Sequence, residues 1–143
     1  MNAERTTRSL EHLGLLTTHV ERLAGKFPLR DHPTLRSQMR RSAIDSLAHA
    51  ACGLEAVSED DLRRLLCRSL AALTELETYA RLARRAGALT PTEEAQVLLL
   101  TGQAGHSVKL CLDLYADAPV QTEVGRSLLR KVTAPAVALS GAA

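Results

Sequence analysis

Four long stretches of this chain carry apolar residues at steps of three and four, and this spacing constrains the fold more than any other feature. The steps match the 3.6-residue turn of an α-helix, so each stretch has an apolar side that needs burial. The spacing predicts helices over residues 5–25, 33–56 and 59–86, and a fourth from Pro91 to residue 117. The predicted inward positions of the first three helices are Leu10, Leu13, Leu16, Val20, Leu23, Leu35, Met39, Ala43, Leu47, Ala50, Leu54, Leu62, Leu66, Leu70, Leu73, Leu76, Ala80 and Ala83.

The segments between these stretches contain residues that begin or end helices. Gly25 and two prolines interrupt the first pattern, and Pro33 suits the first turn of the next helix, where its missing N–H costs nothing. Ser58 and Thr90 are expected N-caps, each with an acidic residue three positions on, and Gly87 is expected to end the third helix. Four helices with short connections predict an all-α, up-down antiparallel four-helix bundle.

The composition also favours helices packed on helices. Aromatic residues make up only 2% of the 143 residues, so the core must be built from Leu, Ala and Val, whereas strands are enriched in β-branched and aromatic residues. The length suits one domain, which we expect to be the bundle over residues 1–118. Residues 119–143 are expected to form a tail, with a short basic helix followed by a disordered end.

Two absences in the sequence predict a cytoplasmic protein with no membrane partner. No apolar run approaches the ~18 to 20 residues of a membrane span. The first residues also lack the hydrophobic centre of a signal peptide. Cys52, Cys67 and Cys111 are odd in number and widely spaced, so we expect them to be reduced and to behave as small buried hydrophobes.

Sequence motifs of enzymes are missing from this chain. It has no Gly-rich phosphate loop, no Gly-x-Ser-x-Gly and neither the His-Glu-x-x-His nor the Glu-x-x-His motif of metal sites. His49 and Cys52 lie three positions apart, and an antiparallel third helix would bring Cys67 near them, which is a combination that zinc accepts. A fourth ligand is not evident, so we favour a structural role for all three. The prediction is a protein that is not an enzyme and holds no metal or cofactor.

Charge is sorted by segment along the chain. Residues 26–44 carry five basic residues against Asp31, residues 62–86 carry six arginines against two glutamates, and residues 91–118 are acidic overall. Arginines spaced i,i+4 repel one another, whereas a phosphate backbone rewards such a row because each neutralised phosphate releases counterions. A solvated helix face is the alternative. The scarcity of aromatics argues against base stacking, so we expect contacts to the RNA backbone and shape. The candidate binding residues are Arg30, Arg36, Arg40, Arg41, Arg63, Arg64, Arg68, Arg81, Arg84 and Arg85.

Several segments resemble a known superfamily. "KFP" after the first helix, "LRSQMRRSAIDSL" in the second and "SLAALTELETYARLARRAGALTP" across the third and fourth are similar to four-helix-bundle proteins of two related groups. One group is encoded in intervening sequences of 23S ribosomal RNA genes, and the other is the accessory variability determinant (Avd) of diversity-generating retroelements. The first group commonly carries Asn-Ile-Ala-Glu-Gly late in its second helix, whereas residues 49–53 read His-Ala-Ala-Cys-Gly here, which is closer to the Avd type.

The resemblance covers residues 10–117 and implies an assembly and a function. Both groups form pentameric, barrel-like rings, so a homopentamer is expected. Leu15, Leu99, Leu110 and Leu114 exceed what one inward stripe can bury and would leave apolar surface for neighbouring copies. The Avd group implies a non-enzymatic accessory subunit that binds a reverse transcriptase and structured RNA. The alternative is an intervening-sequence protein associated with ribosomal RNA.

Overall fold

The computed structural model describes residues 2–116, and within that range the chain is entirely helical apart from its connections. The elements in order are α1 (Asn2–Ala24), the short 3-10 helix η1 (Leu29–Asp31), α2 (Pro33–Leu54), α3 (Glu59–Arg85) and α4 (Pro91–Ala116). The all-α prediction is confirmed, and the predicted helix ends differ from these by at most three residues. The predicted tail over residues 119–143 lies outside the described residues.

The starts of α3 and α4 are capped as the sequence predicts. The Asp61 backbone N–H donates to Ser58 Oγ over 3.1 Å. At α4 the Glu93 N–H donates to Thr90 Oγ1 over 3.2 Å, and the Thr90 N–H donates to Glu93 Oε2 over 2.8 Å. These two reciprocal bonds complete a capping box, which satisfies N–H groups that have no partner inside the helix.

The end of α3 is a glycine-dependent turn. Gly87 has φ of 76°, a left-handed conformation that residues with a Cβ rarely adopt. The Ala88 N–H donates to the Ala83 carbonyl over 2.8 Å, and the Gly87 N–H donates to the Arg84 carbonyl over 3.2 Å. This pair of bonds is a Schellman motif, so the prediction that Gly87 ends the helix is confirmed.

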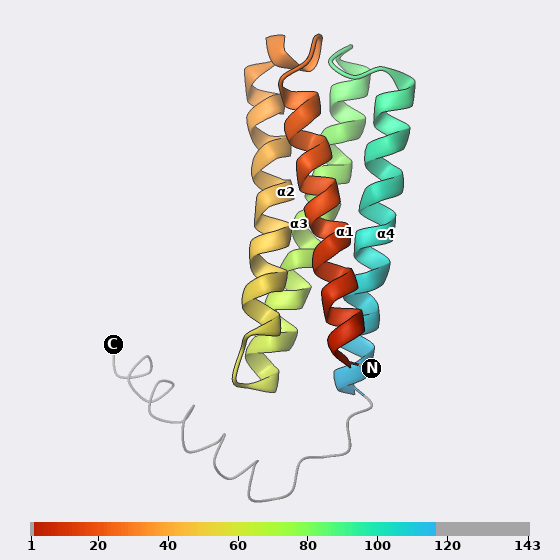
Figure 1. Ribbon diagram of the computed structural model, residues 1–143. Helices are drawn as coiled ribbons and strands as arrows, with labels where there is room; N and C mark the ends of the chain where they lie inside the picture. Colours follow the sequence, from red (N-terminus) through yellow and green to blue (C-terminus); the bar gives the residue numbers. More distant parts are fainter. Residues whose placement is uncertain (1, 117–143) are drawn as a thin grey trace, which may run out of the picture.

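The four helices run alternately up and down, and each packs against two neighbours (Figure 1). The packed pairs are α1 with α2, α2 with α3, α3 with α4, and α1 with α4. The α1–α2 and α3–α4 connections lie together at one end, which we call the two-loop end. The α2–α3 connection and the start of α1 lie at the other end, which we call the N-terminal end. Within residues 2–116, no helix is long and apolar enough to cross a membrane.

The core consists almost entirely of aliphatic side chains from all four helices. Leu13, Leu16, Met39, Leu66 and Leu76 are fully buried, and full burial of such a side chain contributes roughly 1.5 to 3 kcal/mol. Most of the predicted inward positions lie in this core. The exceptions are only partly buried and pack against its edge: Leu10, Leu35, Leu47, Leu54 and Leu70.

Small residues bring α2 and α3 close together, which the apolar spacing did not predict. Ser69 is fully buried and donates to the Ser46 carbonyl over 2.7 Å, and Ser46 is itself buried. A Cβ placed on Gly53 would lie 3.1 Å from Leu65 Cβ. The two backbones therefore approach so closely that only a glycine fits at this point without a shift.

The two glycines of α4 do not mark a close approach between helices of this chain. At Gly102 a Cβ would meet nothing within 4 Å. At Gly105 a Cβ would lie 3.7 Å from Leu73 Cδ1, which is an ordinary contact. Ala104, the other small residue of this segment, is fully buried.

Exposed apolar side chains occur on every helix of the bundle. Leu15 and Leu99 are 59% and 62% exposed, as the sequence predicts. Leu110 and Leu114 are half-buried, so each leaves less apolar surface than Leu15 or Leu99. The other large apolar residues that are exposed within residues 2–116 are Phe27, Ile44, Val57 and Leu82.

Candidate nucleic-acid interface

The fold divides the candidate arginines between the two ends of the bundle. Because α2 and α3 are antiparallel, the end of α3 lies beside the start of α2, at the two-loop end (Figure 1). Arg63, Arg64 and Arg68 follow the α2–α3 connection and lie toward the N-terminal end. The ten arginines therefore do not form one continuous surface. Those toward the two-loop end are Arg30, Arg36, Arg40, Arg41, Arg81, Arg84 and Arg85.

Four of the candidate arginines are paired with carboxylates. Arg40 Nε donates to Glu21 Oε1 of α1 over 2.8 Å, and this bond raises the pKa of Arg40. Arg41 lies 3.7 Å from Asp45. On α3, each of the first two arginines pairs with an acid of the preceding turn: Arg63 with Glu59, and Arg64 with Asp61.

These pairs offset part of the repulsion between the arginines spaced i,i+4. The acids come from the preceding turn for Arg63 and Arg64, and from the following turn for Arg41. For Arg40 the acid is Glu21 of the adjacent helix, which spacing along one segment does not reveal. The hydrogen bonds from Arg64 and then Ser58 also hold the pKa of Asp61 below its usual range, so this carboxylate stays ionised. The net charge along the α2 edge is consequently much smaller than its arginines alone indicate.

The other six arginines have no ion pair among the described residues: Arg30, Arg36, Arg68, Arg81, Arg84 and Arg85. Arg36 is half-buried, and its Nε is buried with no hydrogen-bond partner in the described part of the chain. Arg68 lies apart, in the half of α3 that follows the α2–α3 connection. The remaining four lie in the η1 connection or the last turns of α3. We call this group the basic end: Arg30, Arg81, Arg84 and Arg85.

An exposed aromatic residue accompanies the basic end. Phe27 is 65% exposed in the α1–α2 connection, and the Arg30 guanidinium carbon lies 5.4 Å from its ring centre. Such a contact holds the guanidinium over the ring face. The expectation that no aromatic is available for stacking is therefore wrong for this residue. Its signal in the sequence was the single phenylalanine of the chain, placed between Lys26 and Pro28 in a segment that ends a helix.

A structural explanation also exists for part of the basic end. Arg84 and Arg85 lie in the last turn of α3, where positive charge is favourable beside the negative end of the helix dipole. That effect is worth typically 0.3 to 1 kcal/mol at an exposed site. It does not explain Arg30, which lies in η1 and has Phe27 as its neighbour.

The cysteines and histidine considered for zinc are not assembled into a site. Within the part of the chain that the structure describes, no group of three His, Cys, Asp or Glu residues is placed to hold a metal ion. Cys52 and Cys67 are exposed, so the prediction that they are buried hydrophobes was wrong. Cys111 is buried, as expected. The two exposed cysteines lie on outward positions of α2 and α3, because the inward positions are occupied by the residues of the core.

Comparisons with known proteins do not assign the chain to a family. No protein-family model matches it, and no curated protein matches it. What the chain does must therefore follow from its own charge distribution and burial, together with the resemblance of its sequence segments.

Proposed function

We propose that this protein is a non-enzymatic accessory subunit of a diversity-generating retroelement, which binds structured RNA and the reverse transcriptase. One observation supports the proposal beyond the sequence resemblance: four arginines that have no ion pair within residues 2–116 lie at one end of the bundle with an exposed aromatic ring. Arginine binds phosphate through a planar fork of donors and also stacks on aromatic rings. RNA offers both groups, in its phosphates and in unpaired bases.

In this proposal the RNA contacts the basic end, and the paired arginines contribute less. A carboxylate beside Arg40, Arg41 or Arg64 reduces the local potential that a phosphate meets.

The protein also assembles into a homopentameric ring, in which exposed apolar residues such as Leu15 and Leu99 meet neighbouring copies. Parallel bundles in such a ring would place five basic ends on one rim, which suits a long RNA.

The RNA part of the proposal is tested with two triple variants that change the net charge equally. We expect Arg30→Gln, Arg84→Gln and Arg85→Gln together to weaken binding to a structured RNA and to flatten its salt dependence. The slope should fall by roughly 0.7 to 0.9 for each lost phosphate contact. Arg40→Gln, Arg41→Gln and Arg64→Gln together should have a much smaller effect. Equal losses in the two variants would contradict the basic end and indicate a response to net charge alone.

The polymerase part is tested by co-purification with a reverse transcriptase that is encoded beside this chain. We expect a stable complex with the unaltered protein. A chain encoded inside a ribosomal RNA gene, with no reverse transcriptase nearby, would support the intervening-sequence alternative instead. Gly53 does not distinguish the retroelement subunit from the intervening-sequence protein, because its close approach to Leu65 gives this glycine a packing role in both proposals.

A further inference from the structure

A pocket of about 200 Å³ lies between α1 and α4, away from the basic end. It is lined by Arg5, Arg8, Ser107 and Leu110. None of these four residues is among the ten candidate arginines. Arg5 and Arg8 lie near the start of α1, at the N-terminal end of the bundle, and Ser107 and Leu110 lie in the second half of α4. Two arginines and a serine therefore border one hollow that the proposed RNA contact does not use.

Two contacts between α1 and α4 fix the relative positions of the residues that line this pocket. His12 Nδ1 and Ser107 Oγ lie 2.6 Å apart, one turn beyond Arg8 along α1. Nearer the start of the helix, the Cys111 thiol donates to the Arg5 carbonyl over 3.8 Å. Burial raises the pKa of the Cys111 thiol, so it remains protonated and able to donate. The backbone of Arg5 and the hydroxyl of Ser107 are thus both positioned by side chains of the opposite helix.

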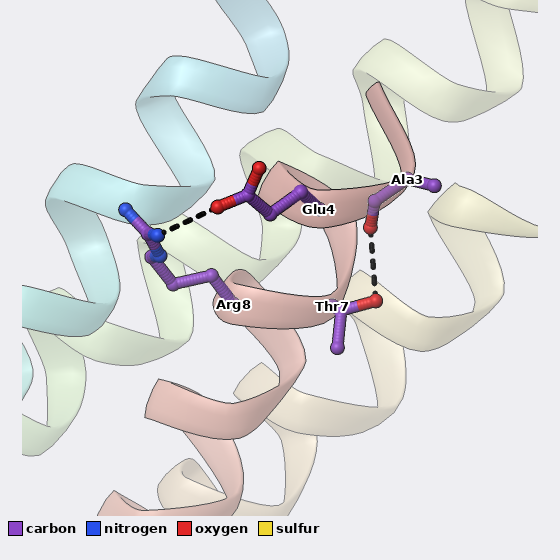
Figure 2. Close-up of polar contacts among 4 residues, drawn as sticks. All are labelled: Ala3, Glu4, Thr7 and Arg8. Atoms are coloured by element: carbon purple, nitrogen blue, oxygen red, sulfur yellow. Dashed lines mark hydrogen bonds and ion pairs between the residues drawn. The ribbon is translucent and has the colours of Figure 1, made fainter. Parts of the chain in front are cut away.

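The arginines of the pocket retain unused hydrogen-bond donors. Figure 2 shows the Arg8 side chain reaching toward α4, with one nitrogen on Glu4 Oε1 at 3.0 Å. A guanidinium has five N–H donors, so the bond to Glu4 leaves most of them available. Glu4 lowers the positive potential beside Arg8, as the acids do beside Arg40, Arg41 and Arg64. Both side chains of the Arg8–Glu4 pair are more than 60% exposed, so solvent screens this pair and an anion competes with it. Arg5 is half-buried and has no ion pair among the described residues.

The hydroxyl of Ser107 can serve as a third donor. A hydrogen bond between an imidazole and a hydroxyl can run in either direction, because a neutral histidine donates from one ring nitrogen and accepts on the other. When His12 donates from Nδ1 to Ser107 Oγ, the Ser107 O–H is free to point into the pocket. An anion in the pocket would favour this arrangement, because it accepts the freed O–H.

We propose that this pocket binds a phosphate group, either free phosphate or the phosphate that ends a small molecule. A phosphomonoester carries about −1.5 to −2 charges and three strong acceptor oxygens, which match two guanidinium groups and one hydroxyl. A carboxylate has one charge and two oxygens and would leave a donor group unused. The volume is below the roughly 300 to 1,000 Å³ of ordinary small-molecule sites, so the hollow suits a single phosphate group. Leu110 offers an apolar wall to the carbon atom next to the phosphate.

The test is an NMR titration of the full chain with inorganic phosphate at constant ionic strength. We expect saturable shifts at the pocket residues and at the His12 ring nitrogens, with a dissociation constant on the order of 1 mM. Arg5→Gln and Arg8→Gln should each raise this constant about tenfold, the value of one charge-assisted hydrogen bond at a partly exposed site. Arg22→Gln is the matched control, because Arg22 is an exposed arginine at the other end of α1 and its loss should change the constant less than about twofold.

Further titrations separate the sources of the phosphate and expose a wrong assignment. Tighter binding of glycerol 3-phosphate than of inorganic phosphate identifies an organic phosphate as the ligand, and equal or weaker binding identifies free phosphate. Acetate that binds as tightly as phosphate would overturn the ligand class.

Absence of saturable shifts at the pocket up to roughly 10 mM phosphate, where a millimolar site is mostly filled, would refute the site. Shifts that persist in a folded Arg5→Gln, Arg8→Gln double variant would refute it as well. The proposed RNA contact could survive any of these outcomes, because it involves the opposite end of the bundle.

Discussion

Glycine has opposite consequences at two positions of this bundle, although both lie within helices. At Gly53 a Cβ would lie 3.1 Å from Leu65 Cβ and 3.4 Å from the Leu62 carbonyl oxygen, and both of those atoms are held by the α3 backbone. At Gly102 a Cβ would meet nothing. A helical glycine costs roughly 0.5 to 1 kcal/mol relative to alanine. At Gly53 the close packing of α2 on α3 offsets this cost. At Gly102 no contact within the described chain offsets it.

We therefore predict opposite signs for the same substitution. Gly102→Ala should raise the free energy of unfolding by about 0.5 to 1 kcal/mol, because it adds helix propensity without a clash. Gly53→Ala should lower it by about 1 kcal/mol, because α2 and α3 must move apart. Urea denaturation followed by circular dichroism measures both. A stabilised Gly53→Ala variant would show that Leu65 yields easily and that the α2–α3 contact is less tight than described.

His19 is the residue whose protonation should matter most for folding. It is half-buried on α1, and its Nε2 is buried with no hydrogen-bond partner among the described residues. Burial lowers the pKa of His19, and the nearby charges of Arg22 and Lys26 lower it further, whereas Glu93 opposes them. The folded protein thus binds the His19 proton less readily than the unfolded chain, whose histidine titrates near 6.5.

The stability of the protein should consequently fall as the pH drops below about 6.5. Above that value His19 is neutral in both states, and below it the unfolded chain gains the proton first, which favours unfolding. Denaturant unfolding at roughly pH 7.5 and 5.5 should show this loss, and His19→Gln should reduce it. His106→Gln is the control, because His106 is exposed on α4. A pH response that His19→Gln leaves unchanged would assign the effect to other groups.

At the scale of elements, the helix ends depend on contacts between residues close in sequence. The capping box at Thr90 and Glu93 and the Schellman motif at Gly87 both lie in the α3–α4 connection, within eleven residues of chain. They turn the chain sharply and deliver Ala88 and Leu89 to the core, where both are buried. The short connection keeps α4 against α3 and so sets the antiparallel order of these two helices.

Removing the cap of α4 should weaken the bundle by an ordinary capping energy. We predict that Thr90→Ala lowers the free energy of unfolding by about 1 kcal/mol, because an N–H of the first turn loses its partner. Thr92→Ala, at an exposed position in the same turn, should stay within about 0.5 kcal/mol of the unaltered protein. Chemical denaturation of the three proteins compares them directly. Similar losses at the two threonines would mean that the capping bonds contribute nothing specific.

At the scale of the whole molecule, the bundle has two chemically different ends and exposed apolar residues on all four helices. The basic end lies at the two-loop end, and the phosphate pocket lies toward the N-terminal end. Leu15, Ile44, Leu82 and Leu99 belong to α1, α2, α3 and α4 in turn, and each is at least 47% exposed. A ring needs two different contact surfaces on each copy, and this distribution supplies apolar residues on more than one side.

The proposed ring gives the prediction that belongs to this scale. Light scattering at micromolar concentration should give a mass about five times the 15.4 kDa of one chain. Leu15→Gln with Leu99→Gln should reduce that mass while circular dichroism still shows a helical protein, because both side chains are largely exposed in the single chain. Val57→Gln, in the α2–α3 connection, is a matched change of one exposed apolar residue and should have less effect. A mass of one chain for the unaltered protein would exclude the ring.

The sequence by itself determined the helices, their caps and the up-down bundle. These features depend on residues within a few positions of one another: the three- and four-residue spacing of leucines, the Ser58 and Thr90 caps, and the glycine at the end of α3. Hydrogen bonds and side-chain contacts at this range are visible in the order of the residues. The aliphatic core followed for the same reason, because one face of each helix is apolar.

Only the tertiary structure decided which polar residues are free to act. Arg40 is paired by Glu21, which comes from a different helix, and the pocket joins Arg5 and Arg8 to a serine about a hundred positions away. The exposure of Cys52 and Cys67, the open space around Gly102 and the close approach of α3 at Gly53 were likewise not evident from spacing. Rotation of each helix about its axis and the closeness of its neighbours set these properties. Both are fixed by packing between helices, which no single segment of the sequence contains.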